Sequence, residues 1–196
     1  MRVFRQHGFS VLELLATLGI ISIVSAMALP STTRTMADLR LRSDARNLHN
    51  AVALAKMRAA ARYTRERIFV DLETNNYLLQ YWDKTANAWT NESGTSPVGF
   101  GVSFGYGSIG TPPPDTQSAI GQSPACTNNT GGTISNTSCI VFNSRGIPID
   151  PATSTPTGDS ALYLTDGTTT YGITLSATPL IRLWATRAGA AEWVHR

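Results

Sequence analysis

The chain has 196 residues, 42% of them hydrophobic and 15% charged, and its formal net charge is +3. This length suits one packed domain with an attached segment, and the absence of an internal repeat or a domain-sized linker excludes repeat and multi-domain architectures. The charge is uneven: nine basic and three acidic residues between Arg34 and Arg67 give +6, whereas two basic and eight acidic residues between Asp71 and Ile181 give −6. Gly, Pro, Ser, Thr and Asn crowd the second half, which is typical of an exported, β-rich domain.

An apolar segment runs from Phe9 to Leu29. As a helix with a rise of about 1.5 Å per residue it spans about 30 Å, the thickness of the hydrocarbon core of a bilayer. Because Arg2 and Arg5 precede it, the positive-inside rule places the N-terminus in the cytoplasm and everything after Pro30 on the other side. The sequence therefore predicts a single-pass membrane protein.

One acidic residue, Glu13, lies within this apolar segment. A carboxylate at the centre of a membrane helix costs roughly 2.5 to 3.5 kcal/mol, and such residues usually have a partner. Two interpretations give it none. The segment is either a signal peptide cleaved after Ala28, within the small-residue pattern Ala26-Met27-Ala28, or a plain anchor whose glutamate lies near the interface.

A third interpretation comes from the residues around Gly8. A short basic leader ends in Gly8 and is followed by Phe-Ser-Val-Leu-Glu, which resembles the prepilin processing site of type IV pilins and type II secretion pseudopilins. The resemblance implies that residues 1–8 are a leader peptide, removed between Gly8 and Phe9 by a membrane aspartyl peptidase that also methylates the new amino group. Residues 9–30 then remain as the transmembrane and assembly helix.

This resemblance gives Glu13 a partner. Cleavage creates an ammonium group on Phe9, one helical turn before Glu13, and in a filament Glu13 can meet the Phe9 ammonium of an adjacent subunit. Such a pair sets subunit register more than overall stability. Gly8, which lacks a Cβ, lets a protease approach the backbone. Pro30 interrupts the helical hydrogen bonds where pilin helices loosen in the filament.

The region from residue 31 to 67 has the pattern of an amphipathic basic helix. Apolar residues recur at steps of four and three, and we expect this face to pack against a sheet while the arginines occupy the other faces. The apolar positions are Leu41, Ala45, Leu48, Val52, Ala55 and Ala59.

From residue 68 to 196 the pattern is typical of short strands in a small antiparallel sheet. The expected strands are RIFVDL, NYLLQYW, VGFGVSFGY, CIVF, ALYLT, TYGITL and LIRLW. Asp166-Gly167 is a strong hairpin signal between two of them. The predicted fold class is therefore α+β, with a long N-terminal helix packed on an antiparallel β domain.

A variable loop is expected over residues 107–136, which include three consecutive prolines. Cys126 and Cys139 flank the polar stretch TNNTGGTISNTS, a suitable ring for a disulfide in an oxidising compartment. The alternative is a pair of buried free thiols. Metal binding is not expected, because His7, His49 and His195 lie far from the cysteines in the sequence.

The sequence contains no complete motif for catalysis or for binding a cofactor. A dinucleotide-binding pattern is matched by Gly105, Gly107 and Gly110, but three prolines follow where the helix of such a site would have to begin. No nucleophile elbow is present, and Asp71 and Glu73 read as a solvated strand edge. We therefore expect no enzyme activity and no cofactor.

The order of elements, including IVFNSRG and a late GITLS strand, resembles the GspH/FimT-type minor pilins and pseudopilins. The resemblance implies a structural subunit of a type IV pilus or a type II secretion pseudopilus in the bacterial inner membrane, with its C-terminal domain in the periplasm. The implied partners are prepilin peptidase, other pilin subunits, the inner-membrane assembly platform and membrane lipid.

DNA is the alternative partner. Arginine and indole together suit nucleic acids, so Arg182, Arg187 and Arg196, close to Trp184 and Trp193, are candidate DNA contacts. Some family members bind DNA through a GRxR segment after the last long strand; the corresponding place here reads SATPLIRLW.

Overall fold

The computed structural model describes residues 9–190 and 192–196, so the expected leader, residues 1–8, lies outside the described residues. One long helix, α1 (Val11–Ala61), precedes eleven strands, and the chain divides into two compact units, Met1–Ala37 and Asp38–Arg196. α1 contributes to both units. The predicted α+β class, with an N-terminal helix and antiparallel sheets, is confirmed.

The second half of α1 is amphipathic as predicted. All six residues of the expected apolar face are fully buried: Leu41, Ala45, Leu48, Val52, Ala55 and Ala59. The helix ends at Ala61, six residues before the predicted limit at residue 67. Tyr63 adopts the left-handed conformation (φ 52°), and the amide of Thr64 donates to the carbonyl of Ala59 at 3.3 Å. This Schellman-type ending terminates the helix without a glycine.

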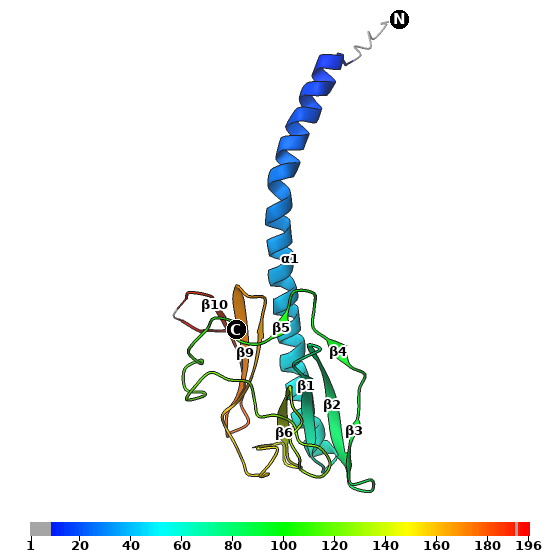
Figure 1. The fold of residues 1–196 in the computed structure, drawn as a ribbon, viewed down its shortest axis with the longest axis vertical. Helices are drawn as coiled ribbons and strands as arrows, with labels where there is room; N and C mark the ends of the chain where they lie inside the picture. Colours follow the sequence, from blue (N-terminus) through cyan, green and yellow to red (C-terminus); the bar gives the residue numbers. More distant parts are fainter. Residues whose placement is uncertain (1–8, 191) are drawn as a thin grey trace, which may run out of the picture. The chain divides into compact units, whose positions relative to one another are not determined.

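The strands form two antiparallel sheets (Figure 1). The first has the order β3-β2-β1-β6-β7, with β4 also paired to β2. Its strands are β1 (Glu66–Asp71), β2 (Asn76–Asp83), β3 (Ala88–Asn91), β4 (Ser96–Pro97), β6 (Thr137–Phe142) and β7 (Pro148–Ile149).

The second sheet has the order β11-β10-β9-β8-β5. Its strands are β5 (Ser103–Phe104), β8 (Ser160–Thr165), β9 (Thr169–Leu175), β10 (Ile181–Arg187) and β11 (Val194–His195). Asp166 and Thr169 close the β8–β9 hairpin, and Gly167 has a φ of +87° at the first central position of the turn. A positive φ at that position is what a type II′ turn requires, so glycine fits it.

Two expectations about the strands were wrong. A single sheet was expected, but the strands divide into two because each sheet covers part of the same helical face. The stretch VGFGVSFGY was expected to be one strand, but only Ser103 and Phe104 pair, because Gly101 (φ +81°) and Gly107 (φ +59°) take backbone conformations that end a strand.

The main core lies where both sheets meet the second half of α1. Alternate residues of the central strands point toward the helix, as the twofold repeat of a strand requires. They include Ile68 and Val70 of β1, Ile140 and Phe142 of β6, Leu162 and Leu164 of β8, Ile173 and Leu175 of β9, and Leu183 and Ala185 of β10.

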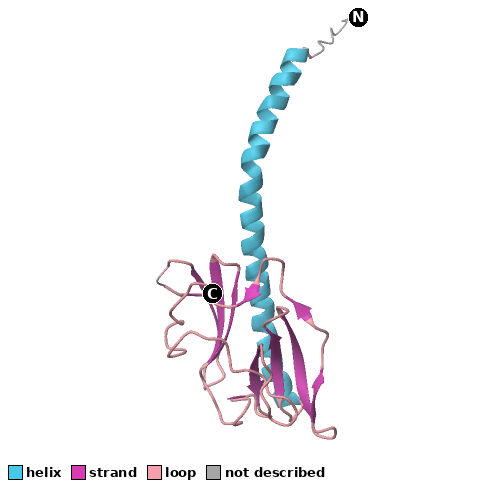
Figure 2. Ribbon diagram, in the orientation of Figure 1, coloured by secondary structure: helices cyan, strands magenta, loops and turns pink. Residues whose placement is uncertain are grey.

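Long irregular segments connect several strands, as Figure 2 shows. The longest, residues 105–136, lies in part along the edge of β8. The amide of Ser123 donates to the carbonyl of Ala161 at 2.7 Å, and the side chain of Gln122 bonds both backbone groups of Tyr163. These bonds satisfy backbone groups that an open strand edge would leave unpaired.

Candidate functional site

The N-terminal segment begins as a capped helix. The amide of Leu12 donates to the hydroxyl of Ser10 at 3.2 Å, and the amide of Leu14 donates to the carbonyl of Ser10 at 3.1 Å. Ser10 therefore acts as the N-cap. Glu13 lies in the first turn of α1, where a carboxylate interacts favourably with the helix dipole. Its side chain is exposed, and it has no ion-pair partner within the described part of the chain.

The N-terminal part of α1, residues 11–26, presents apolar side chains on all its faces. A helix that is apolar all round is normally covered by other protein or by lipid. Two of its hydroxyls are satisfied internally, because Thr17 donates to the carbonyl of Leu14 and Ser22 to that of Leu18. More than half of the surface of each of these side chains is exposed: Phe9, Val11, Leu12, Leu14, Leu15, Leu18, Ile20, Ile21, Ile23 and Val24.

Three further points concern the predicted processing and assembly residues. Gly8 lies outside the described residues. Phe9 is 84% exposed, and α1 continues through Pro30 as one helix. Within residues 9–190 and 192–196, no helix has the combined length and hydropathy of a membrane span.

A basic groove lies between the second half of α1 and the second sheet. It consists of two adjoining hollows of about 290 and 390 Å³, both lined by Arg42, Tyr171 and Arg196. Arg46 and His49 of α1 line one hollow, and Arg187 of β10 lines the other, together with Asp38 and Glu192. Among the described residues, none of these arginines takes part in an ion pair, so their charge is available to an anionic partner.

The structure brings only two of the three candidate DNA contacts to this groove. Arg187 lies on the face of β10 that carries Leu183 and Ala185 toward the core, whereas Arg182 lies on the opposite face by strand alternation. Arg196 is held close by its own amide, which donates to the carbonyl of Leu183 at 2.9 Å. Arg182 therefore does not contribute to the groove.

Cys126 and Cys139 form a disulfide, with their Cα atoms 5.0 Å apart. Both are buried in a second apolar cluster with Val141 and Ile149. The bond fastens the irregular segment before β6 to the first sheet.

Arginine and tryptophan side chains interleave on the face of the first sheet that points away from α1. The guanidinium of Arg67 lies 4.0 Å from the ring centroid of Trp89, and that of Arg65 lies 4.5 Å from Trp82. Arg67 is 2% exposed and donates to Gln80 and to the carbonyl of Thr127, each at 2.7 Å. Because both partners are protein groups, Arg67 holds the disulfide-bonded loop in place instead of awaiting a ligand.

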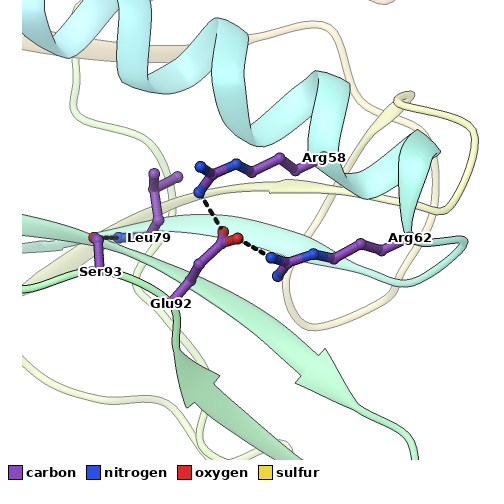
Figure 3. Close-up of polar contacts among 5 residues, drawn as sticks. All are labelled: Arg58, Arg62, Leu79, Glu92 and Ser93. Atoms are coloured by element: carbon purple, nitrogen blue, oxygen red, sulfur yellow. Dashed lines mark hydrogen bonds and ion pairs between the residues drawn. The ribbon is translucent and has the colours of Figure 1, made fainter.

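Two carboxyl groups meet at the C-terminal end of α1. Glu92, which follows β3, pairs with Arg58 at 2.8 Å and with Arg62 (Figure 3). Glu66, the first residue of β1, is fully buried beside Glu92, and neither of its carboxyl oxygens receives a hydrogen bond from a donor among the described residues. Burial and the neighbouring Glu92 carboxylate raise the pKa of Glu66 to about 8.

The pKa of Glu92 shifts in the opposite direction. Burial alone would raise it, but the hydrogen bond with Glu66 and the ion pairs with Arg58 and Arg62 lower the pKa of Glu92 overall. Glu92 is therefore the ionised member of the pair. Neither glutamate was predicted from the sequence, because single acidic residues at strand ends look like ordinary solvated side chains.

Two features thus stand out as candidates for function: the apolar N-terminal part of α1, which begins at Val11, and the basic groove. Within the residues that the structure describes, no group of acidic, histidine or cysteine side chains is arranged to hold a metal ion.

Comparison with known proteins identifies the first of these features. The prokaryotic N-terminal methylation motif matches residues 3–29. The match supports a type IV pilin-like protein. Such a motif points to processing by prepilin peptidase and to assembly with other pilin subunits, as a structural subunit. Comparisons with curated proteins and with solved structures found no significant match.

Proposed function

We propose that this protein is a minor pilin or pseudopilin of the GspH/FimT type, a structural subunit of a type IV pilus or a type II secretion pseudopilus. Prepilin peptidase removes residues 1–8, and residues 9–30 hold the protein in the bacterial inner membrane with the domain after Pro30 in the periplasm. The assembly platform then transfers the subunit from membrane lipid into a filament.

The observation that carries this proposal is the position of the methylation motif on the apolar half of α1. The matched residues, 3–29, include residues 11–26 of α1, where the described side chains are exposed and, apart from Glu13, uncharged and largely apolar. The same helix continues into the core of the Asp38–Arg196 unit. A filament of packed helices would cover the apolar half while leaving the β domain folded outside it.

The mature N-terminus tests the proposal. We expect the protein isolated from bacterial membranes to begin at Phe9 and to carry one methyl group on its amino nitrogen, measured by intact-mass and peptide mass spectrometry. Gly8→Val should prevent cleavage because its branched side chain blocks the peptidase, whereas the neighbouring His7→Ala should still be cut. A mature chain that begins after Ala28 would contradict the proposal.

DNA is a second candidate partner, favoured by the basic groove. Four arginines that form no ion pair with any described residue, Arg42, Arg46, Arg187 and Arg196, line the groove. Arginines of this kind bind phosphate groups and release counterions, so the affinity falls steeply with salt.

A gel-shift titration of the full chain in detergent against duplex DNA tests this candidate. We expect binding at low salt, and we expect Arg42→Ala with Arg187→Ala to lower the slope of log affinity against log salt by about one for each phosphate that the variant no longer neutralises. Arg182→Ala is the matched control, because Arg182 lies on the other face of β10. Absence of binding at low salt would remove DNA as a partner.

A further inference from the structure

The buried carboxyl group of Glu66 has no ion-pair partner among the described residues. Glu66 begins β1, which lies between β2 and β6, and its backbone neighbours on those strands are Tyr81 and Phe142. Glu66 is 0% exposed, and neither of its oxygens has a hydrogen-bond donor within the described part of the chain. A buried carboxylate in such a place is costly unless it is neutralised.

The groups that face Glu66 come from three elements. Glu92 approaches from the segment after β3, Arg58 and Arg62 approach from the last turns of α1, and Tyr81 lies opposite on β2 with the Arg62 guanidinium 5.0 Å from its ring centroid. The two arginines pair with Glu92 and not with Glu66. Their charge therefore serves one carboxylate, and a second carboxylate beside it would be repelled.

A proton on one of the two carboxyl groups removes the repulsion between them. Two ionised carboxylates can only accept hydrogen bonds, so the hydrogen bond between Glu66 and Glu92 requires one of them to be protonated. We propose that Glu66 and Glu92 form a proton-binding site, in which one proton held by Glu66 fastens the segment after β3 to the first sheet and, through Arg58 and Arg62, to the end of α1. This inference goes beyond the proposed function and does not depend on it.

The segment after β3 forms two hydrogen bonds with β2 that show whether it is in place. The amide of Glu92 donates to the carbonyl of Leu79 at 2.9 Å, and the amide of Leu79 lies 3.3 Å from the hydroxyl of Ser93, the bond drawn in Figure 3. β4 follows directly and pairs with the start of β2. If the segment moves away from α1, these amides lose their partners and exchange with solvent.

The direction of the pH dependence follows from linkage. The closed site binds the proton up to a pKa of about 8, whereas an exposed glutamate releases it near the ordinary value of 4.5. Between these values the closed form holds more protons than the open form, so opening becomes easier as the pH rises. The limiting increase is about tenfold in the opening equilibrium per pH unit, and it levels off above about pH 8.

Amide hydrogen exchange of the full chain in detergent tests the site. Exchange in the peptides that cover residues 77–97 would be compared between the wild type and Glu66→Gln, at equal pH from about 5 to about 9, so that the intrinsic rate cancels. We expect the ratio of wild-type to variant exchange to rise with pH by up to tenfold per unit and then level off, because glutamine stays neutral. A ratio that does not change with pH would overturn the proposal.

Glu73→Gln is the matched control, because Glu73 lies in the solvent-accessible turn between β1 and β2; it should behave like the wild type. Infrared spectroscopy of the wild type gives an answer even if Glu66→Gln does not fold. The native protein should show the carbonyl band of a protonated carboxyl group at neutral pH, and the band should disappear as the pH passes about 8. A native protein without this band at neutral pH would equally overturn the proposal.

Discussion

Gly172 of β9 lies against the ring of Tyr163 on the neighbouring strand. A Cβ at this position would lie 2.8 Å from Cε1 of Tyr163 and 3.5 Å from the ring of Trp193. Tyr163 cannot move easily, since it is fully buried, its hydroxyl donates to Gln117 at 2.8 Å and its ring packs edge-on against Tyr106. Glycine is therefore required by close packing at this position and not by backbone conformation.

We expect Gly172→Ala to lower the free energy of unfolding by roughly 1–3 kcal/mol, as overpacking of a filled site usually does. Denaturant unfolding followed by tryptophan fluorescence measures the change. Gly121→Ala is the matched control, because no atom lies within 4 Å of a Cβ built at Gly121. Equal stability of the two variants would show that the β8–β9 pair adjusts freely.

The environments of single charged residues could not be predicted from the local sequence pattern. Glu66 and Arg67 are adjacent charged residues at the start of β1, and nothing in their local pattern distinguishes them from a solvated strand end. Both are buried, yet Arg67 has protein acceptors and Glu66 has an acidic neighbour. Partners from residues 80, 92 and 127 decide this, and a local sequence window does not contain them.

Among the elements, α1 was the most predictable. Its buried face repeats at helical spacing over about five turns, so periodicity alone identified each of the six core residues. β3 was missed because it is only four residues long and none of them is fully buried. Its assignment depends on pairing with β2, which places Trp89 opposite Trp82.

Glu13, in the first turn of α1, is the residue whose role in filament assembly can be tested. We expect Glu13→Ala to leave membrane insertion and cleavage after Gly8 intact but to lower incorporation into filaments, by about tenfold if the pair with the Phe9 ammonium contributes about 1.4 kcal/mol. Quantitative immunoblotting of sheared filaments against membranes measures the ratio. Ser22→Ala is the control, because the Ser22 hydroxyl donates to a carbonyl of its own helix.

A pair that sets subunit register predicts a specific loss, namely fewer subunits in the filament with normal amounts in the membrane. Normal incorporation of Glu13→Ala would exclude the register role and leave Glu13 with its helix-dipole interaction alone.

On the scale of the whole molecule, two basic parts of the sequence come together in space. Basic residues of α1 and of the C-terminal strands meet in one groove, although more than a hundred residues separate Arg46 from Arg187 in the sequence. The sequence predicted Arg187 and Arg196 as candidate DNA contacts, and it predicted a basic face on the helix as well. Their combination depends on how β10 and β11 pack beside α1.

The sequence by itself determined the processing motif, the apolar half of α1, the six buried positions of its second half, most of the strands and the α+β class. These are local properties, because a cleavage site, a helical repeat or a strand alternation is complete within a few turns of chain. Only the tertiary structure decided that the strands form two sheets, that Arg182 lies apart from Arg187 and Arg196, and that Glu66 is buried beside Glu92. Those outcomes depend on pairing between distant segments, where burial removes water from a charge and leaves its new neighbours to determine its state.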